Sequence, residues 1–125
     1  MNIVVWIATG LLAAVFLMAG VMKLTRSKAQ LVENPAMGWV TDFSPRILKL
    51  IGAAEVLGAL GLILPGALDT ATWLVPAAAV GIGALMVGAA ITHARRREIP
   101  NVAVNLVLLA VAIFVAVERI GPQSF

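Results

Sequence analysis

Four long apolar runs constrain the fold of this chain more than any other feature. A helix of about 20 apolar residues crosses a hydrocarbon core of about 30 Å, because each residue adds 1.5 Å. Runs close to that length follow one another here and end at charged or helix-breaking residues. They predict an all-α fold, a four-helix transmembrane bundle in one domain (residues 1–125), with spans at about 3–23, 46–64, 72–93 and 100–118.

Composition agrees with a membrane protein in contact with the lipid bilayer. The chain is 62% hydrophobic and 12% charged, whereas a soluble domain carries about 25% charged residues. The absence of cysteine excludes disulfides, thiol relays and cysteine-held metal centres within the chain. The pattern also predicts no metal site, because metalloprotease and other metal-ligand spacings are missing. The net charge of +3 does not indicate nucleic-acid binding, because the basic residues flank the apolar runs.

Basic residues gather on one side of the predicted bundle. Every lysine and arginine except Arg119 lies in or beside the loops that join spans one to two and three to four. Such loops stay in the cytoplasm by the positive-inside rule, so we expect both termini outside. No basic residue precedes the first run, so we expect an uncleaved helix rather than a signal peptide.

The connection Thr25–Phe43 is the one long loop. Trp39 and Phe43 stand there among polar residues, and tryptophan is enriched at membrane–water interfaces. We therefore predict a short interfacial segment that covers the cytoplasmic mouth of the bundle.

Glu55 is the residue that points to a functional site. It lies at the centre of the second span, where an ionisable side chain costs several kcal/mol unless it faces protein or water. Gly52, Gly58 and Ala59 share its helix face. Small residues let another helix approach closely, so Glu55 is predicted on the packing face.

Other polar groups belong to the same half of the bundle. Lys23 and His93 end the first and third spans, and Asn101 and Asn105 open the fourth. The candidate ligand-binding residues are therefore Glu55, Asn105, Lys23, His93, Asn101 and Trp39, with Glu55 and His93 as candidates for acid–base catalysis. Plainer roles also fit: Lys23 as an end anchor, the asparagines as interhelical bonds, and Glu55 as a neutral structural donor.

Two segments resemble the DoxX-like family of small four-helix membrane proteins. They are Met18–Leu24 at the end of the first span and Lys49–Gly61 in the second, together with His93 before a basic cluster and the Pro100–Asn105 opening of the fourth. The resemblance implies a bundle in a bacterial inner membrane. It also implies links to quinone-coupled sulfur oxidation, to oxidative-stress complexes and to receptor chaperoning.

Three functions are compatible with these residues. We rank first an accessory or ligand-binding subunit of a membrane redox (quinone-linked) or stress-response system, with a quinone or other lipophilic ligand near Glu55 and a membrane or redox protein as partner. A membrane-embedded enzyme of isomerase type comes second, and a small proton-coupled transporter third. Small residues four apart in the third span, Ala77/Gly81, Ala79/Gly83 and Ala84/Gly88, also allow a homo-oligomer.

Overall fold

The structure is a computed structural model that describes residues 1–125, except for the side chain of Ala36. The described chain is built from helices: α1 (Asn2–Thr25), α2 (Lys28–Val32), the 3₁₀ segment η1 (Pro35–Asp42), α3 (Pro45–Leu68), α4 (Leu74–Arg95) and α5 (Ile99–Ile120). α1, α3, α4 and α5 are each long and apolar enough to cross a membrane. The predicted all-α four-helix bundle is therefore confirmed, and the chain is a multi-pass membrane protein.

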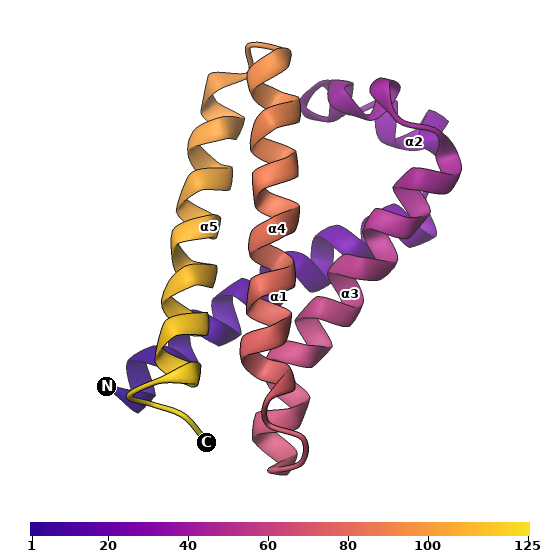
Figure 1. Ribbon diagram of the computed structural model, residues 1–125. Coiled ribbons are helices and arrows are strands. Elements are labelled where there is room, and N and C mark those ends of the chain that lie inside the picture. Colours follow the sequence, from indigo (N-terminus) through magenta and orange to yellow (C-terminus); the bar gives the residue numbers. More distant parts are fainter.

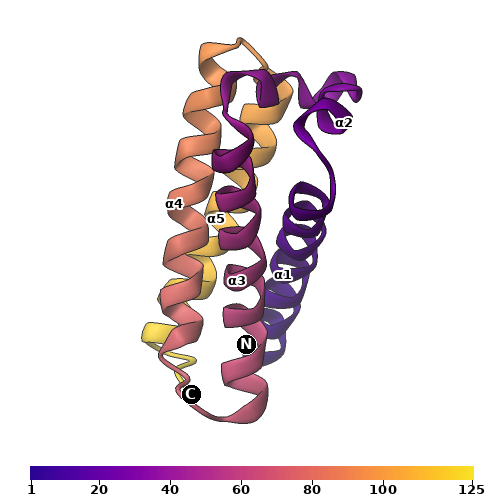
Figure 2. The same cartoon turned by 90° about the vertical axis from the view of Figure 1, so that its right-hand side faces the viewer.

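The four long helices form a ring with unequal contacts. α1 packs against α3 and α4 against α5, while α3/α4 and α1/α5 close the ring with smaller contacts. Figure 1 shows α4 and α5 side by side, whereas α1 and α3 lean away from them toward the end that α2 and η1 occupy. Figure 2 places α2 and η1 at that same end of the bundle. Both termini lie at the opposite end.

Two apolar clusters hold this arrangement. The larger one joins all four long helices and includes Leu12, Phe16, Leu62, Ile82 and Val115. The smaller one, Leu31, Val40 and Leu48, fixes α2 and η1 onto the start of α3. Large apolar side chains also cover the outer faces of the bundle, where lipid would contact them.

Proline lies in the first turn of two long helices. Ser44 accepts a hydrogen bond from the Ile47 amide, and Pro45 follows in the first turn of α3. Pro100 likewise occupies the first turn of α5, where proline's missing N–H has no helical partner to lose.

The second span extends beyond the predicted end at residue 64. α3 continues through Pro65 and Gly66 to Leu68, and Asp69 ends it in a left-handed conformation at φ 51°. A proline removes only one helical donor, and the Pro65 carbonyl still accepts from the Thr70 amide. Asp69 therefore caps the end of α3 and not the start of the helix that follows it. α4 instead begins after Trp73 without a side-chain cap.

Candidate ligand-binding site

The site begins at a close crossing of α1 and α3. A Cβ atom at Gly20 would lie 2.7 Å from the carbonyl oxygen of Gly52 and 2.9 Å from the Val56 amide nitrogen. A Cβ at Gly52 would in turn lie 2.9 Å from the Cβ of Lys23. Only glycine fits this approach of two backbones, and the approach brings the end of α1 against the middle of α3.

The crossing places Lys23 beside Glu55. The Lys23 ammonium lies 2.8 Å from Glu55 Oε1, and the two side chains are 7% and 6% exposed. Apart from this ion pair, Oε1 has no hydrogen-bond partner among the described residues. The carboxylate therefore keeps the capacity to accept a further donor.

Lys49 fixes the end of α1 above this ion pair. Its ammonium donates to the carbonyl oxygens of Lys23, Leu24 and Arg26 at 2.8, 3.0 and 2.7 Å. The last carbonyls of a helix have no partner within it and carry partial negative charge, so a lysine there satisfies both needs. Lys49 thus joins α3 to α1 and holds the backbone of Lys23 in place.

A cavity of about 580 Å³ opens on the other side of the ion pair. α1, α3, α4, α5 and η1 all contribute to its walls, which are mostly apolar. All six predicted ligand-binding residues line it: Lys23, Trp39, Glu55, His93, Asn101 and Asn105. A volume of this size suits a small organic molecule. The assignment of these six residues to ligand binding stays a prediction.

η1 covers the mouth of the cavity. Met37, Trp39 and Phe43 face into it, and the Trp39 ring packs edge-to-face on His93 at 5.8 Å between centroids. The Lys23 ammonium lies 5.6 Å from the centroid of the Trp39 ring, within the range of a cation–π contact. Trp39 therefore contacts both His93 of α4 and Lys23 of α1.

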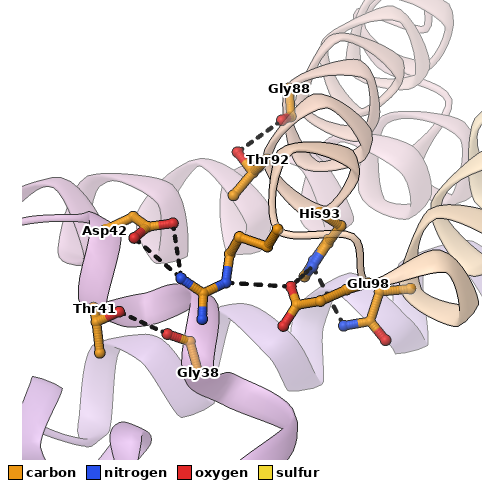
Figure 3. Close-up of polar contacts among 9 residues, drawn as sticks. Gly38, Thr41, Asp42, Gly88, Thr92, His93 and Glu98 are labelled. Carbon is orange, nitrogen blue, oxygen red and sulfur yellow. Dashed lines mark hydrogen bonds and ion pairs between the residues drawn. The ribbon is translucent and has the colours of Figure 1, made fainter.

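A surface ion pair ties η1 to the turn between α4 and α5. The Arg96 guanidinium reaches both carboxylate oxygens of Asp42, at 3.1 and 3.2 Å. Figure 3 shows Asp42 of η1 brought against the turn that carries His93 and Glu98. The segment from Pro35 to Asp42 is thus held at one end by Arg96 and in its middle by the buried Val40.

His93 is oriented by the residues that follow it. Its Nδ1 lies 2.7 Å from Glu98 Oε1 and 3.3 Å from Asn101 Nδ2 (Figure 3). A carboxylate only accepts hydrogen bonds, so Nδ1 carries the proton and donates to Glu98. Asn101 Nδ2 is also a donor, so its approach to Nδ1 is a contact and not a second hydrogen bond. The hydrogen bond from His93 to Glu98, helped by the charge of Arg96, holds the pKa of the Glu98 carboxyl below its usual value of 4.5.

Asn105 lies deeper in the cavity than His93. Its amide nitrogen is 3.9 Å from the sulfur of Met86, which is a weak acceptor. The structure shows no bond between Asn105 and Glu55, and Asn105 contacts Met86 of α4. Its amide therefore keeps hydrogen-bonding capacity for a molecule in the cavity.

Sequence reasoning missed the residues that support the site. In the sequence, Lys49 and Arg96 appear only among the basic residues in or beside the two basic loops. Both hold the site through contacts with distant residues, α1 carbonyls for Lys49 and Asp42 for Arg96. The one local signal was that Lys49 lies inside a predicted span, where a charge needs a partner.

The arrangement suits binding of an uncharged lipophilic molecule with a polar group. The Lys23–Glu55 pair carries no net charge, so it does not select for a charged ligand. An ammonium and an amide can donate to a carbonyl oxygen, and a carboxylate can accept from a hydroxyl. The remaining walls are apolar, as ligand sites generally are.

Comparison with known proteins gives one match. The sequence model described as the DoxX-like family matches residues 7–115, a range that covers α3, α4, α2 and η1 entirely and most of α1 and α5. No curated protein and no solved structure was found to match the chain.

Proposed function

The chain belongs to the DoxX-like family, and we propose that it serves as an accessory, ligand-binding subunit of a membrane redox (quinone-linked) or stress-response system. Its cavity would hold a quinone or a similar lipophilic molecule against the Lys23–Glu55 pair. The observation that carries this proposal is a cavity of about 580 Å³ whose walls are apolar except for one group of polar residues.

The depth of the cavity in the bundle supports a lipophilic ligand. Glu55 lies about 15 Å along α3 from its start, well inside the apolar part of the span. Several accessible lining residues are apolar or small: Val15 of α1, Ala84 and Gly88 of α4, and Val104 of α5. A ligand held there would lie at the depth of the hydrocarbon layer, which suits a lipophilic molecule.

The polar groups match a carbonyl-bearing headgroup. Lys23 of α1 and Asn105 of α5 supply donors, and Trp39 supplies an aromatic surface over the mouth of the cavity. Stacking and donation to a carbonyl are the two interactions that orient a flat ring in a pocket.

The remaining expectations belong to the same proposal. The chain would lie in a bacterial inner membrane with both termini outside, as the basic loops suggest, and would associate with a partner membrane or redox protein. Homo-oligomers would use α4, where Ala77, Gly81, Ala84 and Gly88 are exposed while Ala79 and Gly83 are buried in the bundle or nearly so.

A fluorescence titration tests ligand binding. In the Trp6→Phe, Trp73→Phe background Trp39 is the single tryptophan, and it lines the cavity mouth. Ubiquinone-2 added to this protein in neutral detergent should quench the fluorescence of Trp39, and the quenching should saturate. Gly88→Leu should weaken that binding about tenfold, because a side chain at Gly88 meets nothing within 4 Å and Gly88 lines the cavity.

Gly81→Leu is the matched control. Gly81 lies two turns earlier on α4, also has open space around its Cβ position, and does not line the cavity. Both substitutions change helix propensity equally. Quenching without saturation, or equal weakening by the two variants, would exclude this cavity as the binding site.

A further inference from the structure

Arg119 forms a second polar centre at the opposite end of the bundle. It lies in the last turn of α5, and only 5% of it is exposed. Its guanidinium lies 4.1 Å from the ring centroid of Phe125 and 5.2 Å from that of Trp6. Gly66 of α3 makes room for these rings, since a Cβ there would lie 2.6 Å from Phe125 Cζ.

Only one nitrogen of this guanidinium is satisfied. Nη1 donates to Asn2 Oδ1 and to the Gln123 carbonyl oxygen, both at 2.7 Å. Nε and Nη2 are buried and have no hydrogen-bond partner among the described residues. None of the ion pairs among those residues involves Arg119, so two aromatic rings face the buried charge but no anion balances it.

The two unpartnered nitrogens are chemically informative. Nε and Nη2 form one edge of the guanidinium plane, and their two parallel N–H groups match the two oxygens of a carboxylate or a phosphate. A buried charge without a partner costs several kcal/mol. An oxyanion at this edge would supply both the missing acceptors and the missing charge.

Space for such a group lies beside Arg119. A cavity of about 270 Å³ is lined by Arg119 and by two hydroxyl-bearing residues, Thr72 and Ser124, with Trp73 at its side. This is several times the volume of about 30 Å³ that a water molecule occupies in the liquid. It admits a phosphate or carboxylate group but not a whole lipid.

We propose that Arg119 and this cavity form an oxyanion-binding site, separate from the Glu55 cavity. The anion is either the phosphate of a phospholipid headgroup or a soluble oxyanion. Tryptophans at this end, Trp6 and Trp73, suit the headgroup level of a bilayer. Nε and Nη2 are closed to solvent, so the anion reaches this edge when the Phe125 ring, 4.1 Å from the guanidinium, moves aside. The Trp6 ring keeps the guanidinium in one orientation.

The native tryptophans allow a direct test. In the Trp39→Phe background the remaining tryptophans, Trp6 and Trp73, both belong to this end. The protein is titrated in dodecyl maltoside, which carries no anion, with dioctanoyl-phosphatidylglycerol, inorganic phosphate or acetate. Dioctanoylglycerol, which has the same chains without phosphate, is the lipid control.

A saturable change in the fluorescence of Trp6 and Trp73 with the phospholipid, but not with dioctanoylglycerol, supports the headgroup as the source of the anion. A saturable change with phosphate or acetate supports a soluble anion. Arg119→Lys keeps the charge but loses the two-nitrogen edge, so it should weaken binding at least tenfold. Arg46→Lys, exposed at the other end, should leave binding unchanged. Equal binding by Arg119→Lys and wild type would overturn the proposal. If Arg119→Lys does not fold, the wild type alone decides, because the absence of saturation with every anion also overturns it.

Discussion

The Lys23 ammonium and the Glu55 carboxylate lie 2.8 Å apart across the α1–α3 crossing, with both side chains almost fully buried. Each residue is costly alone within an apolar bundle. Together they form a neutral pair on the wall of a cavity, and the Gly20–Gly52 contact sets their separation. Glu55 is therefore not an isolated charge in the membrane but half of a pair.

The pair should show strong coupling in unfolding measurements. Lys23→Met leaves Glu55 buried without its partner, and Glu55→Leu does the same to Lys23, so each should lower the free energy of unfolding by about 3 kcal/mol. The double variant should lose much less than the sum of both. Thermal or denaturant unfolding in detergent, followed by circular dichroism, measures the cycle. Additive losses would mean that the two charges do not depend on each other.

The glycine crossing should tolerate no methyl group. Gly20→Ala places a Cβ at 2.7 Å from the Gly52 carbonyl oxygen, and overpacking of this kind costs about 1–3 kcal/mol. Gly10→Ala is the control on the same helix, because its Cβ would meet nothing within 4 Å. That variant should be neutral or gain up to about 1 kcal/mol from helix propensity. Equal melting temperatures for the two variants would refute the close crossing.

Much of the bundle follows from local signals in the sequence. Apolar length predicted the four spans, and small residues around Glu55 predicted that it packs inside, as Gly52 against α1 and Gly58 against Ile82 of α4 now show. Helix order along the chain predicted that Lys23 and His93 finish at the same end. These inferences needed only helical periodicity and the alternation of spans.

Other features depended on contacts that no local pattern encodes. Pro65 looked like a stop signal, but α3 continues because its far end packs on distant rings, Trp6 and Phe125. In the sequence, Arg119 is only the one basic residue that lies away from the two basic loops. In the structure it is buried by residues at both ends of the chain. Asn105 contacts Met86 because α5 packs directly on α4.

Acid should weaken the turn between α4 and α5 through Glu98. The folded-state pKa of Glu98 is lowered from 4.5, chiefly by the hydrogen bond from His93. A lowered carboxyl pKa means that Glu98 contributes stability above its unfolded pKa and that this contribution is lost as pH falls through the folded pKa. The contribution is small, because the Glu98 side chain is 26% exposed and water screens the interaction.

Melting temperatures between pH 6 and pH 3 test this point. On acidification the melting temperature of the wild type should fall more than that of Glu98→Gln, because the variant has no carboxyl group to titrate at this position. Glu33→Gln, an exposed carboxylate elsewhere in the same end of the bundle, should behave like the wild type. If the Glu98 variant loses as much as the wild type, the His93–Glu98 bond does not persist in solution.

The Arg96–Asp42 pair should affect access to the cavity more than it affects the stability of the fold. Asp42 is 47% exposed and Arg96 31%, and exposed pairs of this kind contribute at most about 1 kcal/mol. Asp42→Asn should therefore barely change the melting temperature. It should loosen η1 and increase quenching of Trp39 by aqueous iodide in the single-tryptophan background, whereas Glu33→Gln should not. Unchanged quenching in Asp42→Asn would show that this pair does not hold η1 over the cavity.

Photoaffinity labelling tests the central claim most directly. A quinone analogue that carries a diazirine on its tail is irradiated with the protein in native membranes, and the labelled residues are mapped by mass spectrometry. Binding in the Glu55 cavity predicts labels on lining residues such as Ala19, Met37 and Leu108, with loss of label when unmodified quinone competes. Labels confined to lipid-facing residues such as Leu57 and Val107, unaffected by competition, would contradict it.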